Sequence, residues 1–161
     1  MEFLTKQLQR AALAAIDRSS NEMQKGVSTL ESVASMKHHA KWGDNICWVV
    51  DRLKGQAKDG VESLGLAGAM NEQQSYATNQ LSKLTNACTV VKDATCLPTT
   101  SAQVSSVLSN IPPVKVACLE LSGDLESFAH ALRDMQRQRE QDRARLKHID
   151  KPQDKPSLRG L

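Results

Sequence analysis

Residues 114–149 read VKVACLELSGDLESFAHALRDMQRQREQDRARLKHI, and this stretch decides the fold. Alternate steps of four and three residues from Val114 reach Cys118, Leu121, Leu125, Phe128, Leu132, Met135, Arg139, Asp142, Leu146 and Ile149. Apolar side chains occupy nine of these eleven positions, which we call the seam. Heptad spacing of this kind predicts a helix that buries one apolar stripe.

The composition favours packed helices over a β-sheet. Of 161 residues, 40% are hydrophobic but only 3% are aromatic, and alanine supplies much of the apolar content. Strand-based cores draw on aromatic and β-branched residues, and a chain of this length forms one domain. We therefore predict an all-α protein, a single helical bundle of about four to five helices over residues 1–149. Its last helix, about 113–149, is long and projects in part, and residues 150–161 form a disordered tail because they have little to bury.

The first helix begins within the first few residues. Its predicted inner face consists of Leu4, Leu8, Ala12, Ile16, Met23, Val27, Leu30 and Ala34. The segment 19–22 has the S-x-x-E form of a capping box, which would allow the helix to restart there. The apolar spacing continues in phase across this segment, so we expect one long helix.

Two further helices follow a break at Gly43 and Asp44. The second runs to about Leu64, and its apolar face is Trp42, Ile46, Val49, Val50, Leu53 and Ala57. A connector over 65–69 precedes a cap pattern that opens the third helix at Asn71. The stripe of this third helix is Met70, Ala77, Leu81, Leu84 and Cys88.

Prolines dominate the prediction for the next segment. Residues 92–100 read as a loop, and a short helix then carries Val104, Val107, Leu108 and Ile111. Pro112 and Pro113 close that helix, because a proline disfavours the helical conformation of the residue before it. Pro113 suits the first position of the last helix, although the glycine at position 123 would also permit a start near 122–124. Only from Leu125 onward do both possible starts place the seam residues in the last helix.

Residues able to support chemistry are scattered, and we predict no catalytic residue, cofactor or metal. Cys88 and Cys118 lie on apolar stripes, where a thiol packs as a small hydrophobic group. Cys88 and Cys96 could form a disulfide in an oxidising compartment. The pair His38 and His39 suits the end of the first helix better than a metal site, because adjacent positions diverge by about 100° around a helix. We expect His130 to face solvent.

One tryptophan and the distal seam are the predicted partner-binding residues. Trp48 has polar neighbours one helical turn away on both sides, so it is either covered by the adjoining helix or left exposed as an interface anchor. Beyond Met135 the chain is charged nearly all round, and only Leu146 and Ile149 resume the apolar pattern. Arg139 and Asp142 occupy seam positions between, where they could pair across two chains and set their register.

The charge is concentrated at the C-terminus. The net charge of the chain is +3. The segment from Arg133 onward contains nine Lys/Arg and five Asp/Glu, whereas the residues before it have a net charge of −1. Segment 133–159 could therefore contact nucleic acid as an electrostatic arm, without sequence specificity because acids alternate with the bases and aromatic side chains are lacking. We expect no membrane insertion, and no secretory signal opens the chain. The chain is expected to be cytoplasmic, or exported without a cleavable signal peptide.

These observations favour a non-enzymatic interaction or assembly module, such as an adaptor, a chaperone-like protein or a structural subunit. It would self-associate or bind a protein partner through its C-terminal helix and the Trp48 face. The alternative is a nucleic-acid-associated protein that uses residues 133–159. In composition the chain is similar to small Ala/Ser/Gln-rich helical proteins of secretion machines, viruses and phages, without a shared motif.

Overall fold

The computed structural model describes residues 2–97 and 100–149, and side chains over 3–97 and 100–148. This part of the chain forms four helices, namely α1 (Glu2–Ser35), α2 (Trp42–Leu66), α3 (Asn71–Thr95) and α4 (Ser101–Ile149). The all-α prediction is confirmed. The expected tail over 150–161 lies outside the described residues.

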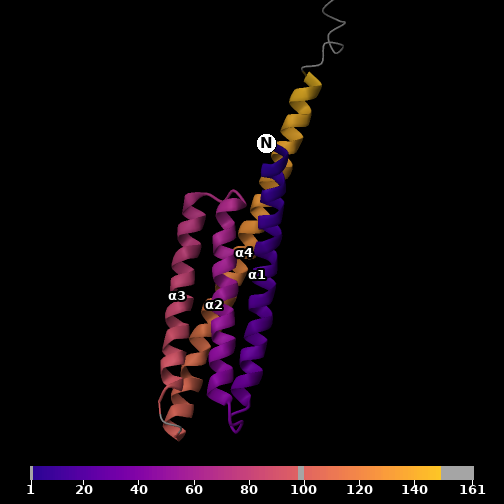
Figure 1. Cartoon of the computed structure of the whole chain (residues 1–161). Helices are drawn as coiled ribbons and strands as arrows, with labels where there is room; N and C mark the ends of the chain where they lie inside the picture. Colours follow the sequence, from indigo (N-terminus) through magenta and orange to yellow (C-terminus); the bar gives the residue numbers. More distant parts are fainter. Residues whose placement is uncertain (1, 98–99, 150–161) are drawn as a thin grey trace, which may run out of the picture.

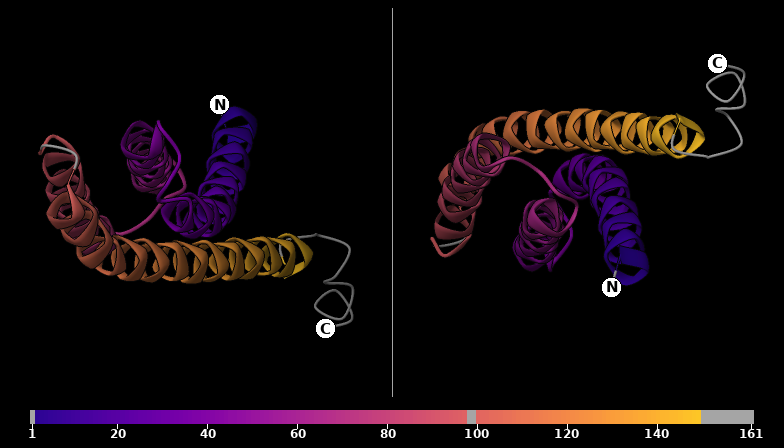
Figure 2. Two further views of the ribbon diagram at one scale, coloured as in Figure 1. Left: turned by 90° about the horizontal axis from the view of Figure 1, so that it is seen from below. Right: turned by 90° about the horizontal axis from the view of Figure 1, so that it is seen from above.

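The helices run alternately down and up, and Figure 1 shows α4 continuing past the ends of α2 and α3. Each helix packs beside its neighbour in sequence, and α4 also packs along α1, which closes the bundle. Seen along the bundle in Figure 2, α4 passes beside α3 at one end and beside α1 at the other. The core lies between the four helices, and its apolar residues form one continuous cluster.

Helix α1 is unbroken, as its in-phase stripe predicts. Ser19 and Ser20, which could have restarted it, are instead buried against other helices. The prediction is wrong for Leu4 and Leu8, which are 60% and 58% exposed. The last residue of α2, Leu66, lines a groove together with Ala15. The first turns of α1 therefore extend beyond the end of α2, and their side chains on that flank have no helix to cover them.

Small residues bring α1, α2 and α4 close together near the middle of the bundle. The Ser19 hydroxyl donates a hydrogen bond to the backbone oxygen of Gln56 in α2. A Cβ atom added at Gly60 would lie 2.4 Å from Ser19 Oγ and 2.8 Å from Leu125 Cδ1. Gly60 therefore allows a helix approach that any larger residue would obstruct.

A second polar contact joins α1 to α4. Ser20 and Ser122 are both buried, with their hydroxyl oxygens 2.7 Å apart. Ser20 Oγ also donates to Glu126 at 2.9 Å, and Gln24 Nε2 donates to the same carboxylate at 2.7 Å. These bonds satisfy the buried hydroxyls and fix the position of α4 along α1.

Two boundaries predicted from the sequence are wrong. Helix α3 continues to Thr95 through part of the expected loop, and α4 begins at Ser101 and passes through Pro112 and Pro113 without ending. Both prolines are exposed, so the backbone oxygens that lose their N–H partners can bind water. The neighbouring side chains of Ile111 and Val114 are buried in the core. Tertiary packing thus outweighs the local preference to break the helix.

The buried face of α4 departs gradually from the predicted seam. A strict seven-residue repeat drifts about 20° per heptad around a straight α-helix. Ala129 is therefore fully buried, whereas Phe128 is only partly buried and Met135 is 40% exposed. Phe128 turns toward α3, where its ring packs edge-on against Tyr76 with centroids 6.2 Å apart. The late seam positions consequently turn away from the bundle core.

Candidate functional site

The distal part of α4 projects from the bundle. At about 1.5 Å per residue, the 49 residues of α4 span about 74 Å, whereas the 34 residues of α1 span about 51 Å. Every side chain from Arg137 to His148 is exposed. Leu146, 59% exposed, is the large apolar residue in this segment. The prediction of a partly projecting last helix is confirmed.

Arg139 and Asp142 lie on this projecting segment, and both are exposed. Asp142 accepts a hydrogen bond from Gln138 at 3.2 Å, and its carboxylate lies 3.4 Å from Arg145. Both contacts are local to α4 and exposed to water, so they leave the carboxylate available to a further cation. The structure brings Arg139, Asp142 and Leu146 together on one side of α4. The side chain of Ile149 lies outside the described residues.

A groove separates this segment from the start of α1. It has a volume of about 320 Å³ and is lined by Thr5, Lys6, Gln9, Gln136, Arg139, Glu140 and Arg143. The lining includes three cationic side chains and a single carboxylate, so its net formal charge is positive. Gln136 Nε2 donates to Gln9 Oε1 at 3.4 Å and joins α4 to α1 at this groove.

Apolar side chains gather at the same end of the bundle. Half of the fourteen large apolar residues exposed in the described chain belong to the end from which α4 projects. These are Phe3, Leu4, Leu8, Leu66, Met70, Met135 and Leu146. An end of the bundle that exposes several large apolar residues is suited to contact with another protein. Of these residues, the sequence predicts only Leu146 as partner-binding. The spacing of Leu4 and Leu8 is that of a buried face, and the sequence does not indicate at which residue of α1 the neighbouring helix α2 ends.

Trp48 lies in the first third of α2 and is 60% exposed, so the exposed alternative for this residue is correct. The guanidinium carbon of Arg52 lies 5.4 Å from the ring centroid, a cation–π contact that holds the indole at the surface. Beside it, a groove of about 230 Å³ runs between α1 and α2, and Glu22, Lys25 and Gly26 are among its lining residues. This groove lies in the half of the bundle remote from the projecting end of α4.

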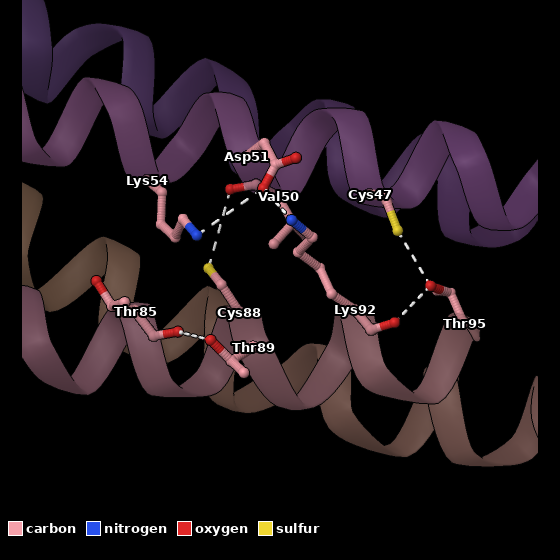
Figure 3. A network of polar contacts seen from close by, with 9 residues as sticks. All are labelled: Cys47, Val50, Asp51, Lys54, Thr85, Cys88, Thr89, Lys92 and Thr95. Atoms are coloured by element: carbon pink, nitrogen blue, oxygen red, sulfur yellow. Dashed lines mark hydrogen bonds and ion pairs between the residues drawn. The ribbon is translucent and has the colours of Figure 1, made fainter. Parts of the chain in front are cut away.

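The cysteines pack rather than form a reactive site. All four are free thiols, and Cys88 and Cys118 are fully buried. Burial raises the pKa of Cys88 to about 11 and that of Cys118 to about 12, which keeps both protonated at neutral pH. Figure 3 shows Cys88 within a contact zone between α2 and α3, where Lys92 pairs with Asp51 at 2.9 Å. The placement of Cys88 and Cys118 in the core is confirmed.

The histidines are all on the surface. His38 and His39 lie in the exposed turn after α1, and His39 Nδ1 accepts the backbone N–H of Lys41 at 3.2 Å. His130 is exposed, as predicted, and lies 3.6 Å from Asp134. Over residues 2–97 and 100–149, no three His, Cys, Asp or Glu side chains are grouped to bind a metal ion. Within the same ranges, none of the helices has an apolar stretch sufficient to span a bilayer.

The predicted site residues thus fall into two groups at opposite halves of the molecule. Arg139, Asp142 and Leu146 share the projecting end of α4, and Trp48 stands apart from them on α2. Along α2 alone, the eighteen residue steps from Trp48 to Leu66 account for about 27 Å of separation. Comparison of the chain with protein-family models, curated proteins and solved structures finds no match.

Proposed function

We propose that the protein is a non-enzymatic assembly module that associates with another protein chain through the projecting end of α4. The observation that supports this proposal is the unbroken run of exposed side chains from Arg137 to His148. This run lies on the part of α4 that extends beyond the other helices. A helix gains most of its stability from packing an apolar face. Within residues 2–97 and 100–149 only the first turns of α1 adjoin this segment, so it is suited to packing against another chain.

The surroundings of the segment support protein binding. Leu146 and Met135 supply apolar surface on α4, and Phe3, Leu4 and Leu8 expose more on the neighbouring turns of α1. Exposed charged residues flank Leu146 along α4, and apolar groups among charged ones are typical of protein interfaces. The Trp48 face gives a second, separate surface, so the module could bind two chains at once.

The basic groove supports a second candidate, an electrostatic contact with nucleic acid. Lys6, Arg139 and Arg143 line one groove and could neutralise phosphates. Salt separates the two candidates, because release of counterions makes phosphate binding fall steeply with ionic strength, whereas apolar helix pairing changes little. Association that persists from low to high salt supports the assembly module.

Sedimentation equilibrium of the wild type and of Leu146→Ser tests the proposal. Burial of a leucine side chain contributes about 1.5–3 kcal/mol, so the variant should associate at least about tenfold more weakly while keeping its helix content by circular dichroism. Val116→Ser is the matched control, since Val116 is 56% exposed on the part of α4 that lies within the bundle. Equal association of Leu146→Ser and the wild type would contradict the proposal.

A further inference from the structure

Four residues of α4 form one face above the end of α3. At 100° per residue, Met135, Arg139, Asp142 and Leu146 fall within about 60° of one another around the helix. We call them the distal face. Lower on α4, this side is covered by α3, since Phe128 packs on Tyr76 and Asp124 accepts a bond from Gln80 at 3.4 Å.

The cover ends where α3 begins. Helix α3 starts at Asn71, and Figure 1 shows α4 continuing beyond it with only the start of α1 beside it. The groove lined by that part of α1 lies mainly on the neighbouring side of α4, through Gln136, Glu140 and Arg143, and Arg139 stands at the border between this groove and the distal face. The place that α3 occupies lower down is therefore open beside the distal face. A helix entering this place would run along α4 much as α3 does.

The order of side chains on the distal face identifies the helix that fits there. Read upward, the face is apolar, basic, acidic and apolar, with steps of four, three and four residues. Read in the opposite direction, from Leu146 to Met135, the spacing is again four, three and four residues, and the order becomes apolar, acidic, basic and apolar. A second copy running in the opposite direction thus presents an acid to each base and an apolar residue to each apolar residue.

We propose that a second copy of this chain occupies the distal face, with the two α4 helices antiparallel and related by a two-fold axis. Arg139 of each chain then pairs with Asp142 of the other, and Met135 of each packs against Leu146 of the other. This inference rests on the proposed function and names its partner. An antiparallel pair also has the polarity that α3 already has beside α4, so the helix packing within the bundle continues across the interface.

A parallel pair is disfavoured by the same residues. In a parallel arrangement each position faces its own copy, so Arg139 would meet Arg139 and Asp142 would meet Asp142. Like charges at facing positions of paired helices oppose association. The antiparallel pair replaces both repulsions with attractions, and it makes the interface self-complementary, as a two-fold dimer requires.

Charge reversal tests this arrangement in the full-length protein. Arg139→Asp places an acid opposite Asp142 twice per dimer, and Asp142→Arg places a base opposite Arg139 twice. Each single variant should weaken dimerisation by on the order of tenfold, since two exposed ion pairs become two repulsions. The double variant Arg139→Asp/Asp142→Arg restores both pairs and should dimerise like the wild type. Sedimentation equilibrium measures all four dissociation constants.

Two control variants change the charge equally on other sides of α4. Lys147→Asp matches Arg139→Asp, Glu140→Arg matches Asp142→Arg, and neither control should weaken the dimer as the distal-face reversals do. All four substituted positions are exposed, so circular dichroism should show unchanged helix content for every variant.

The outcomes separate this inference from the proposed function. Weakened dimerisation of both single variants, together with wild-type dimerisation of the double variant, supports the antiparallel pair. If the wild type associates but charge reversal leaves association unchanged, or the double variant stays as weak as the single ones, the antiparallel register is wrong and the proposed function stands. If the wild type has a mass of 17.7 kDa at every concentration, the inference and self-assembly through α4 both fail.

Discussion

Gly60→Ala tests the close packing of α1, α2 and α4. The new Cβ atom would lie 2.4 Å from Ser19 Oγ, 2.9 Å from Ser19 Cβ and 2.8 Å from Leu125 Cδ1. The Ser19 hydroxyl can rotate away only by giving up its bond to Gln56, and the contacts with Ser19 Cβ and Leu125 Cδ1 require these side chains to shift as well. Overpacking of this kind costs about 1–3 kcal/mol, and the lost hydrogen bond costs about 1 kcal/mol more.

The helix propensity of alanine offsets about 1 kcal/mol of this cost. The expected result is a net loss of about 1–3 kcal/mol in the free energy of unfolding. Gly55→Ala is the matched control on the same helix, because a Cβ atom there has nothing within 4 Å. This control should gain up to about 1 kcal/mol from propensity alone.

Urea denaturation followed by circular dichroism measures both variants against the wild type. Gly60→Ala should unfold at lower urea and Gly55→Ala at higher urea, with similar slopes. Equal stabilisation by both substitutions would refute the close approach of the three helices at Gly60. Destabilisation by both would refute the claim that Gly55 faces open space.

Two further predictions concern the thiols. A thiol reagent should label the native protein first at the exposed Cys96 and last at Cys118, because burial raises the pKa of Cys118 from 9.0 to about 12 and lowers its thiolate fraction about a thousandfold. Peptide mapping after timed labelling measures this order. Rapid labelling of Cys118 in the native protein would contradict its burial. Because the folded state holds the Cys118 proton more tightly than the unfolded state, the resulting stability is complete below pH 9 and is lost as pH rises toward 12. Between pH 9 and 11 the free energy of unfolding should therefore fall less steeply with pH for Cys118→Ala than for the wild type, by up to about 1.4 kcal/mol per pH unit. Chemical denaturation at several pH values measures both pH dependences, and identical dependences would contradict this prediction.

Local periodicity predicts the buried face of a helix well where partners flank its full length. The predicted stripe of α2, from Trp42 through Ile46 and Leu53 to Ala57, is entirely buried. The same reasoning fails for Leu4 and Leu8, because their exposure depends on where α2 stops beside α1. That position follows from the packing of whole helices and is absent from the spacing of apolar residues in α1.

The differences along α4 have two physical causes. Exposed prolines at 112 and 113 were predicted to end a helix, but the buried side chains on either side of them hold it together. A strict heptad count also assigns Phe128 to the core, whereas a straight helix brings Ala129 there. The sequence allowed Arg139, Asp142 and Leu146 to be named as partner-binding residues. It could not predict the open space beside them beyond the end of α3, because that space depends on the relative lengths of α3 and α4.

The central claim is that the end of α4 mediates association and contributes little to the fold. A chain ending at Gln136 tests it directly, because Leu132 is the last buried residue described on α4. Sedimentation equilibrium should give the mass of one shortened chain at concentrations where the full-length protein associates, with a melting temperature changed by no more than a few degrees. Association of the shortened chain equal to that of the full-length protein, or a large fall in its melting temperature, would contradict the account.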